Sequence, residues 1–590
     1  MAKLTVNQKT IKELFENKSS NFLVPDYQRP YAWGETECLQ LWADVVDFAF
    51  PDNNHELFNA QKDEFFLGPI VTFKNDDEKM EIIDGQQRLT TLMLLLRAFY
   101  TKLENEQAEE IRNVCKMIAK CIWKTDEFDK PNKGALKIDS EVASDDDKDE
   151  FLTILRKGMT EKSQKSKYAE NFRLLQDKID KFLSDFPVSF QYLPTRLLNN
   201  CVLLPIEAGT QDYALRIFST LNDRGKPLAD ADIFKAQFYK FYSDLGKRDE
   251  FISEWKELEE LCDKIFNPKN ATPMDELFTR YMYFERAKLK NKSSSTEALR
   301  KFYEKDGYAL LKKHETFENL KVLADFWNDV SNQSTKRFDY DVLRRLFVLN
   351  NAPNNMWTFF VSVYFMKNKD VNGLLEDEAF YTFLDKTTAF IWAYSRTNPG
   401  INALRTPMFS EMLNIVEGKP VEFNEFKFES ESVKNAFSNY EFTNSRQITK
   451  SMLAWWAFYE PLHIRNEGDE DEYESHENYS QELLSVETKF EVEHIFSRNR
   501  QKLENALKSE KSLELLGNKV LLEKKINIRA SDYRFVDKKK YYEKSNVSEL
   551  AELAHNRQQQ DFTETDIIER NSNIMESFVE YLRDNNLLKS

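Results

Sequence analysis

The chain has 590 residues, too many for a single hydrophobic core, so several domains are expected. Its hydrophobic fraction of 41% is that of a globular protein, and only 14 Gly and 16 Pro favour long helices. The net charge of −17 argues against a protein coated in nucleic acid, because non-specific affinity comes from neutralised phosphates. The sequence has no run of 18 apolar residues, no apolar leader and no CxxC pair among its five cysteines, so we expect a cytoplasmic protein with reduced thiols and no membrane partner.

Residues 1–245 have the pattern of a mixed α/β domain. The first twenty residues predict a capped amphipathic helix, and a second helix is expected from about Thr36. Three apolar runs predict strands, namely FFLGPIVTF (65–73), MEIIDG (80–85) and VLLPIEAG (202–209). The strongly apolar segment QQRLTTLMLLLRAFYTKL (86–103) predicts a buried helix, and residues 213–242 predict two helices joined by a glycine turn.

The remainder is expected to be helical over 246–440 and to form a last domain over 441–590. In that last domain KFEVEHIF (489–496) and GNKVLLEKKIN (517–527) predict strands, and DYRFVDKKKYYEK (532–544) has helical periodicity. Residues 497–544 hold 14 Lys and Arg against 7 Asp and Glu, a local excess of positive charge in an acidic chain. Such a run is usually a solvated helix face, but here it surrounds an adjacent acid and imidazole.

A hairpin followed by a helix would place groups suited to phosphodiester hydrolysis together. His494 could draw a proton from the attacking water, while Glu493 and Asn527 hold one divalent ion, magnesium or manganese, that polarises the phosphate. Asn518 could fix the loop that carries His494 by bonding its backbone, and Lys538 could lie close to a phosphate. The alternative is that His494, a lone histidine in an apolar strand, is a satisfied core residue.

A second candidate site lies at the Asp-Gly turn that joins the strand 80–85 to the apolar helix. Helix N-termini bind anions, and Gly85 lets a phosphate approach closely. Arg88 in the first turn could form a bidentate phosphate contact, and Asp84 is suited to a metal ion or a proton transfer. The alternative is an ordinary Asp-Gly helix entry without a ligand.

The C-terminal motifs VEHIFSRN, LGNKVLLEKKIN and FVDKK resemble the HNH (His-Me finger) nuclease domain of the GmrD type. The resemblance implies His494 as general base, Glu493 and Asn527 as metal ligands, and Asn518 as the middle asparagine of the signature. The chain has Ser497 where this family usually has proline, so we expect a less rigid loop there.

The N-terminal motif DGQQR, together with VPDYQRPYAW, FFLGPIV and IFSTLNDRGKPLADADIFK, resembles GmrS-type domains, which share a ParB/sulfiredoxin-like fold. In that family the DGQQR loop supports binding and hydrolysis of an NTP, GTP or ATP; the chain has no P-loop. The resemblance implies nucleotide-site roles for the following residues: Gln28, Arg29, Asp84, Gly85, Gln86, Gln87, Arg88, Asn222, Arg224 and Lys235.

The order of the two motifs resembles a fused GmrSD-type enzyme, a type IV restriction endonuclease of bacterial phage defence. The resemblance implies an α+β, predominantly helical chain: a ParB/sulfiredoxin-like sensor domain at 1–245, a helical linking region at 246–440 and a ββα-metal (His-Me finger) nuclease domain at 441–590. Expected partners are a nucleotide and DNA, above all modified phage DNA, with the oligomeric state open, a homo-oligomer included. Two alternatives remain: an abortive-infection nuclease that acts on RNA or host nucleic acid, and an NTP-driven regulator with an inactive nuclease fold.

Overall fold

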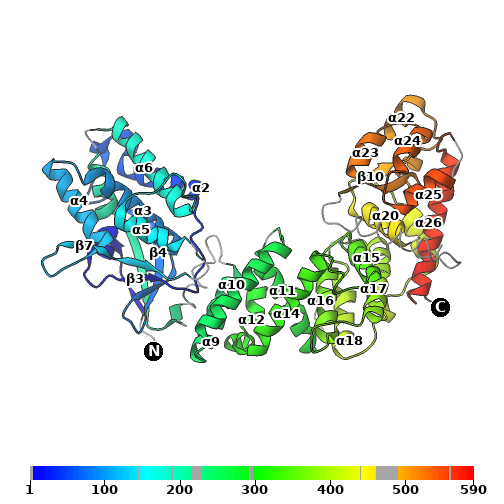
Figure 1. Ribbon diagram of the computed structural model, residues 1–590, viewed down its shortest axis with the longest axis horizontal. Coiled ribbons are helices and arrows are strands. Elements are labelled where there is room, and N and C mark those ends of the chain that lie inside the picture. Colours follow the sequence, from blue (N-terminus) through cyan, green and yellow to red (C-terminus); the bar gives the residue numbers. More distant parts are fainter. Residues whose placement is uncertain are drawn as a thin grey trace. The chain divides into compact units, whose positions relative to one another are not determined.

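The structure is a computed structural model that forms two compact units, Met1–Glu259 and Glu260–Ser590 (Figure 1). The expected boundary near residue 440 therefore lies inside the second unit, where the helical middle and the C-terminal residues pack together. The described residues are 4–142, 145, 147–187, 190–211, 213–214, 217, 229–269, 271–290, 294–295, 297–400, 402–438, 440–459, 489–556 and 560–589.

The first unit is built on a mixed seven-stranded sheet of order β1-β9-β4-β5-β3-β8, with β2 also paired to β9. The central pairs are β4 with β9, parallel, and β4 with β5, antiparallel. The strands are β1 (Leu4–Val6), β2 (Lys9–Thr10), β3 (Phe22–Val24), β4 (Phe65–Lys74), β5 (Met80–Asp84), β8 (Ile138–Ser140) and β9 (Cys201–Ala208), beside a separate hairpin of β6 (Trp123–Thr125) and β7 (Pro131–Leu136).

Helix α3 (Gln86–Leu103) is the centre of this unit. Most of its side chains are buried, and an apolar run of this length is stable when the protein covers it on most sides. It contacts α4, α5 and α6 and shares one core with Ile70 and Ile82 of the sheet. The helices of this unit are α1 (Ile11–Glu16), α2 (Glu35–Ala49), α3, α4 (Glu109–Ile122), α5 (Lys148–Lys157), α6 (Lys167–Asp185), α7 (Tyr192–Asn200), α9 (Asp230–Asp244) and α10 (Arg248–Ile265), whose last turn enters the second unit.

The expected N-terminal helix is shorter than the sequence suggests. A capping box between Thr10 and Glu13 starts α1, as the composition indicates, but the preceding residues form β1 and β2 along β9. Pairing with the sheet satisfies their backbone groups, which overrides local helix propensity. Within the described ranges, no helix combines the length and apolar character needed to cross a bilayer.

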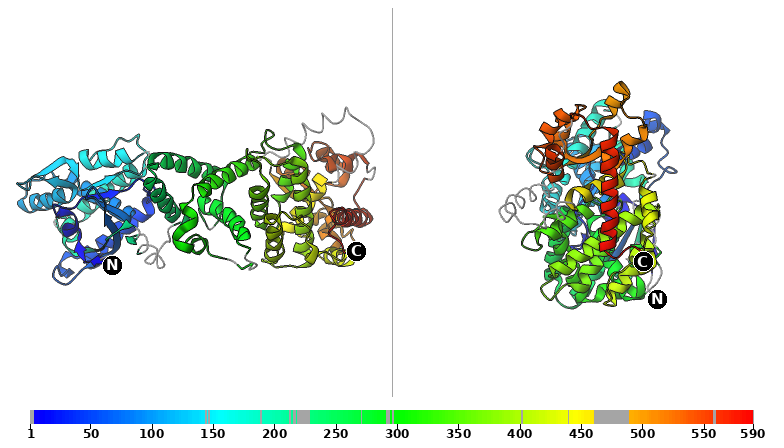
Figure 2. Two further views of the ribbon diagram at one scale, coloured as in Figure 1. Left: turned by 90° about the horizontal axis from the view of Figure 1, so that it is seen from below. Right: turned by 90° about the vertical axis from the view of Figure 1, so that its right-hand side faces the viewer.

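The second unit joins a helical bundle to a small hairpin (Figure 1). In the bundle α11 contacts α14, α16 and α18, and α20 bridges from α15 and α17 to β11 of the hairpin. Figure 2 shows α26 as one long helix near the C-terminus. The elements are α11 (Pro273–Lys288), α12 (Leu299–Tyr303), α13 (Lys305–Tyr308), α14 (His314–Ser331), α15 (Tyr340–Leu349), α16 (Met356–Asn368), α17 (Asp377–Thr397), α18 (Arg405–Val416), α19 (Ser430–Ser438), α20 (Gln447–Tyr459), β10 (Phe490–His494), α22 (Arg498–Glu504), β11 (Lys519–Glu523), α23 (Lys524–Ala530), α24 (Phe535–Tyr542), α25 (Ser548–Asn556) and α26 (Glu564–Asp584).

The described chain is thus mostly helical with one mixed sheet, as expected of an α+β protein. The predicted strands at 65–73, 80–85 and 202–209 correspond to β4, β5 and β9, and the predicted C-terminal strands correspond to β10 and β11. The helical run expected at 532–544 corresponds to α24.

Candidate functional site

The C-terminal candidate site is built on the antiparallel hairpin of β10 and β11. His494, the last residue of β10, lies opposite Lys519, and Glu493 lies opposite Val520. The connection between the strands contains α22, whose N-cap is Ser497: its hydroxyl accepts a hydrogen bond from the backbone N–H of Arg500. Ser497 therefore orders the start of this helix at the position where proline was expected.

Asn518 ties the two ends of this connection together. Its side-chain oxygen accepts from the N–H of Phe496 at 2.8 Å, and its amide donates to the carbonyls of Phe496 at 3.0 Å and Leu513 at 3.2 Å. Its own backbone carbonyl accepts from the N–H of Ile495. Asn518 is fully buried, so these bonds are not exchanged with water. This is the backbone bonding that the sequence predicts for Asn518.

The imidazole of His494 faces a polar cluster that the sequence did not indicate. Its Nε2 lies 3.8 Å from a carboxylate oxygen of Glu514, and its Nδ1 lies 3.5 Å from the amide nitrogen of Asn444. Nε2 is buried and has no hydrogen-bond partner among the described residues. The same carboxylate accepts from Lys519 at 2.6 Å and from Arg498 at 2.8 Å. Neither Glu514 nor Asn444 lies within a recognisable motif, so only the fold brings them to His494.

Burial sets the protonation state of this cluster. Desolvation lowers the pKa of His494, against an opposing effect of Glu514, so the ring is neutral at neutral pH. Burial raises the pKa of Glu514, but the contacts with His494, Lys519 and Arg498 outweigh it and hold that pKa below its ordinary value. Burial also lowers the pKa of Lys519, to about 8. A neutral imidazole beside an ionised carboxylate is the arrangement of a base with a group that stabilises its protonated form.

Glu493 does not share a pocket with the imidazole, contrary to the expectation. Successive side chains of a strand point to opposite faces, so Glu493 faces α24 while His494 faces away from it. The carboxylate of Glu493 accepts from the ammonium of Lys538 at 2.5 Å, and the same ammonium donates to the backbone carbonyl of His494 at 2.6 Å. Lys538 is fully buried, so it does not lie where a phosphate was expected to meet it. Burial raises the pKa of Glu493, and Lys538 acts in the opposite direction.

Asn527 lies on the same side of the hairpin as Glu493 but has another partner. Its amide donates to Glu491 at 3.0 Å, and Glu491 also pairs with Lys524 at 3.3 Å. A divalent cation needs several oxygens directed at one point. Here an ammonium takes the place beside Glu493, and the described residues contain no cluster of three or more metal-binding side chains. The residues in this arrangement do not fit the expected ion.

Helix α26 packs against the residues at the start of β11. Arg570 donates to the carbonyls of Leu516, Gly517 and Lys519 at 2.8 to 3.1 Å and pairs with the buried carboxylate of Glu549. A Cβ on Gly517 would collide with the backbone of α26, so only glycine allows the helix to approach this closely.

In the first unit the DGQQR turn opens α3 as predicted. Gly85 is the N-cap with a φ of +92°, a left-handed conformation that favours glycine, and a Cβ there would lie 2.5 Å from Ile70. The side chain of Gln86 donates to the carbonyl of Arg29 at 2.8 Å. Gln87 accepts from the N–H of Ala32 at 2.6 Å. Both amides thus bind the preceding segment of the protein itself, rather than an open site.

The arginines of the two motifs differ in their surroundings. Arg88 donates to the carbonyl of Pro69 at 2.9 Å and so links α3 to β4. Burial lowers the pKa of Arg88. Arg29 is exposed. Burial raises the pKa of Asp84, and the neighbouring Arg88 and Arg29 counteract this. Asp84 thus lies near two arginines directly before α3 begins.

Two further predicted residues, Gln28 and Lys235, contact other groups of the protein. Gln28 donates to the carbonyls of Ile82 and Ile83 in β5 at 3.2 and 3.1 Å. Lys235 is buried and lies 3.7 Å from Glu259. Asn222 and Arg224 fall outside the described residues.

Comparison with known families matches both ends of the chain. The model of the N-terminal domain of GmrSD restriction endonucleases matches residues 11–239, and the model of the C-terminal domain of GmrSD restriction endonucleases matches residues 429–577. A search of curated proteins found no match. The matched ranges contain the two candidate sites described above.

Proposed function

Because the chain belongs to the family of GmrSD restriction endonucleases, we propose that it cuts modified phage DNA under the control of a nucleotide bound by its first unit. At the coarser level the chain is a type IV restriction nuclease, and DNA is its substrate. We propose three further properties: that cleavage depends on DNA modification, that a nucleotide controls it, and that the residues named below carry it out. The acidic net charge supports this, because low background affinity for unmodified DNA limits damage to the host.

In the proposed reaction His494 takes the proton of the attacking water. The ring is neutral because burial lowers its pKa, so it can accept this proton. Glu514 stabilises the imidazolium that forms, and Asn518 holds the loop in position. Arg498, about half exposed beside Glu514, is placed to contact a phosphate.

The single observation that carries this proposal is the imidazole at the end of β10, with an ionised carboxylate 3.8 Å away. A second candidate is a regulator with an inactive nuclease fold. The buried pair of Lys538 with Glu493 favours it, because the ammonium stands where a catalytic cation was expected.

Cleavage assays with the purified full-length chain separate the two candidates. Modified phage DNA, its unmodified counterpart and total RNA are each incubated with magnesium, with manganese and with a chelator, with and without GTP or ATP. We expect cleavage of modified DNA that is lost in His494→Ala and kept in the control His314→Ala, an exposed histidine of α14. Cleavage by His494→Ala at the wild-type rate would show that this site is wrong. Absence of cleavage by the wild type under all conditions would favour the regulator, and cleavage of RNA alone would favour an abortive-infection nuclease.

We also propose that the nucleotide phosphates meet the start of α3. Gly85, in its left-handed conformation, begins the helix, and exposed Arg29 is a cation close enough to the preceding Asp84 to lower the pKa of that carboxyl. Arg29→Ala removes this cation without removing a side-chain hydrogen bond between described residues, so nucleotide affinity should fall while the melting temperature stays the same. Arg112→Ala, at an exposed position of α4, is the matched control. Equal affinity in both variants would place the nucleotide elsewhere.

A further inference from the structure

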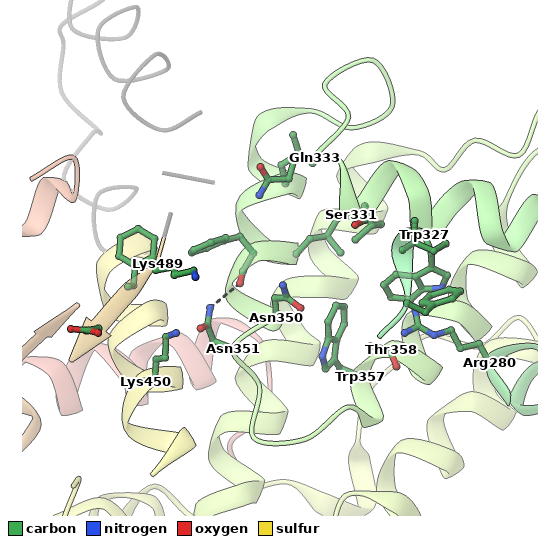
Figure 3. Close-up of a pocket in the computed structure, with 18 of the residues that line it drawn as sticks. Arg280, Trp327, Ser331, Gln333, Asn350, Asn351, Trp357, Thr358, Lys450 and Lys489 are labelled. Atoms are coloured by element: carbon green, nitrogen blue, oxygen red, sulfur yellow. Dashed lines mark hydrogen bonds between the residues drawn. The ribbon is translucent and has the colours of Figure 1, made fainter. Parts of the chain in front are cut away.

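A pocket of about 680 Å³ lies in the second unit, between the helical bundle and the hairpin (Figure 3). Its volume is within the roughly 300–1,000 Å³ typical of small-molecule sites. The bundle contributes residues of α11, α14, α15 and α16 and of the turns that follow α14 and α15, and the hairpin contributes Phe490 and Glu491 of β10. The strand that ends in His494 therefore also forms one wall of this pocket.

Aromatic rings and one buried arginine form the inner part of the pocket. The indoles of Trp327 and Trp357 lie 5.7 Å apart at 65°. The guanidinium of Arg280 lies 4.1 Å from the Trp327 ring and 4.4 Å from the Phe266 ring. Its Nε pairs with Glu276 at 3.0 Å, but its Nη1 is buried and has no hydrogen-bond partner in the described structure. The guanidinium thus adds a flat, positively charged group beside the two rings.

Side-chain amides lie around the rings. Gln333 and Asn350 line the pocket, and neither side chain makes a hydrogen bond within the part of the chain that the structure describes. Figure 3 shows Asn350 beside Asn351, whose own amide donates to the carbonyl of Phe347 at 3.1 Å, and Gln333 at another part of the pocket wall. Flat aromatic walls, free carboxamides and a guanidinium are the groups with which proteins stack on a heterocyclic base and read its edge.

The outer part of the pocket is positively charged. Lys450, Lys489 and Lys524 line it against a single carboxylate, Glu491, which pairs with Lys524. Among the described residues, Lys450 and Lys489 form no ion pair within 4 Å. These ammonium groups could hold the phosphates on either side of a nucleotide. Phe490 and His494 lie on the same face of β10, four residues or about 13 Å apart.

We propose that this pocket receives one modified base that has been turned out of the DNA duplex. A base that is enclosed in a protein pocket has to leave the stack, and a pocket of this volume leaves room for a substituent beyond the base itself. The inference rests on the proposed nuclease function and adds base recognition by the second unit. It also implies that cutting occurs close to the modified base: one strand advances about 3.4 Å per nucleotide, so 13 Å corresponds to about four nucleotides.

The first test uses the full-length variant Gln333→Ala/Asn350→Ala. Neither side chain has a hydrogen bond to another described residue that the substitution would remove, so the melting temperature should not change. In contrast, kcat/KM on modified phage DNA should fall about 10- to 100-fold for two lost hydrogen bonds. The control is Asn332→Ala, which lies in the same turn but does not line the pocket. An unchanged kcat/KM in the double variant would overturn the inference. Failure of the wild type to cut any DNA would instead overturn the proposed function on which the inference rests.

The second test detects base extrusion without cleavage. Full-length His494→Ala is mixed with duplexes that carry 2-aminopurine beside one substituted base, and extrusion of that base raises the 2-aminopurine fluorescence. We expect a rise that is lost when Gln333→Ala/Asn350→Ala is added to this variant and that free GTP or ATP does not suppress. No rise with any substituted base, or a rise that free nucleotide competes away, would show that the pocket does not take a base from DNA.

Discussion

Replacement of Lys538 by methionine tests how the hairpin is held. Lys538 is fully buried, and its ammonium contacts both the carboxylate of Glu493 and the carbonyl of His494. Removing one partner of a buried ion pair costs about 3–5 kcal/mol, because the remaining charge has lost its counter-ion. Taking about 4 kcal/mol, the amides of β10 should exchange hydrogen about 1,000-fold faster in Lys538→Met, since each 1.4 kcal/mol is a factor of ten.

The measurement is amide hydrogen exchange of the full-length chain, followed by mass spectrometry of peptides from residues 490–494. The control Glu493→Gln/Lys538→Met removes both charges and should recover more than half of the loss.

The size of this stability loss should depend on pH in a definite direction. Burial raises the folded pKa of Glu493, and loss of Lys538 raises it further, so the contribution of this carboxyl is favourable at low pH and is lost as the pH rises through the raised pKa. The defect of Lys538→Met should therefore be larger at pH 8 than at pH 5.

Exchange within threefold of the wild type in Lys538→Met would refute the reasoning. It would mean that the ammonium is not the counter-charge of Glu493. A cation could then take that position, as the sequence suggested.

Three further predictions concern the two candidate sites. The acid limb of kcat/KM for cleavage should lie below pH 6.5, because burial lowers the pKa of His494. Glu514→Gln should move this limb to still lower pH, since Glu514 raises the pKa of His494. An acid limb above pH 7 in a pH–rate profile would contradict this. Asn518→Ala should slow cleavage about 100-fold through misplacement of the loop and cost about 1–3 kcal/mol for each buried backbone group left unpaired, measured by kinetics and urea unfolding. Gly85→Ala should lower both the stability of the first unit and its nucleotide affinity, because the new Cβ meets Ile70 at 2.5 Å in a left-handed backbone; isothermal titration showing unchanged binding would exclude a nucleotide at this turn.

The hairpin and the DGQQR turn could be predicted because their information is local. Strand-like runs, a glycine before an asparagine and an Asp-Gly helix entry each specify backbone conformation within a few residues. The bond from Asn518 to Leu513 is also local, whereas its bonds to Phe496 span 22 residues and depend on the pairing of β10 with β11.

Two features of the site were within reach of the sequence but were missed. Strand periodicity alone separates Glu493 from His494, because neighbours in a strand face opposite ways. Helical periodicity places Phe535, Lys538 and Tyr542 on one face of α24, and all three are buried, so Lys538 belonged to the apolar face rather than to the surrounding positive charge.

The residues that contact His494 could not be predicted from strand or helix periodicity. Asn444 and Glu514 reach His494 from other elements, and neither lies in a pattern that marks it. The same holds for the amides of Gln86 and Gln87, whose backbone partners are set by the packing of a distant segment. Contacts between elements depend on the whole fold, which local patterns do not contain.

The hydrogen bonds between α26 and the hairpin determine when the hairpin can form during synthesis. The ribosome synthesises β10 and β11 before α26, yet Arg570 of that helix supplies three of the hydrogen bonds that fix the turn before β11. A nascent chain therefore cannot complete the hairpin until α26 has emerged, because domains fold as units during synthesis. If the hairpin carries the nuclease site proposed above, the nascent chain would cut no DNA before α26 has been made.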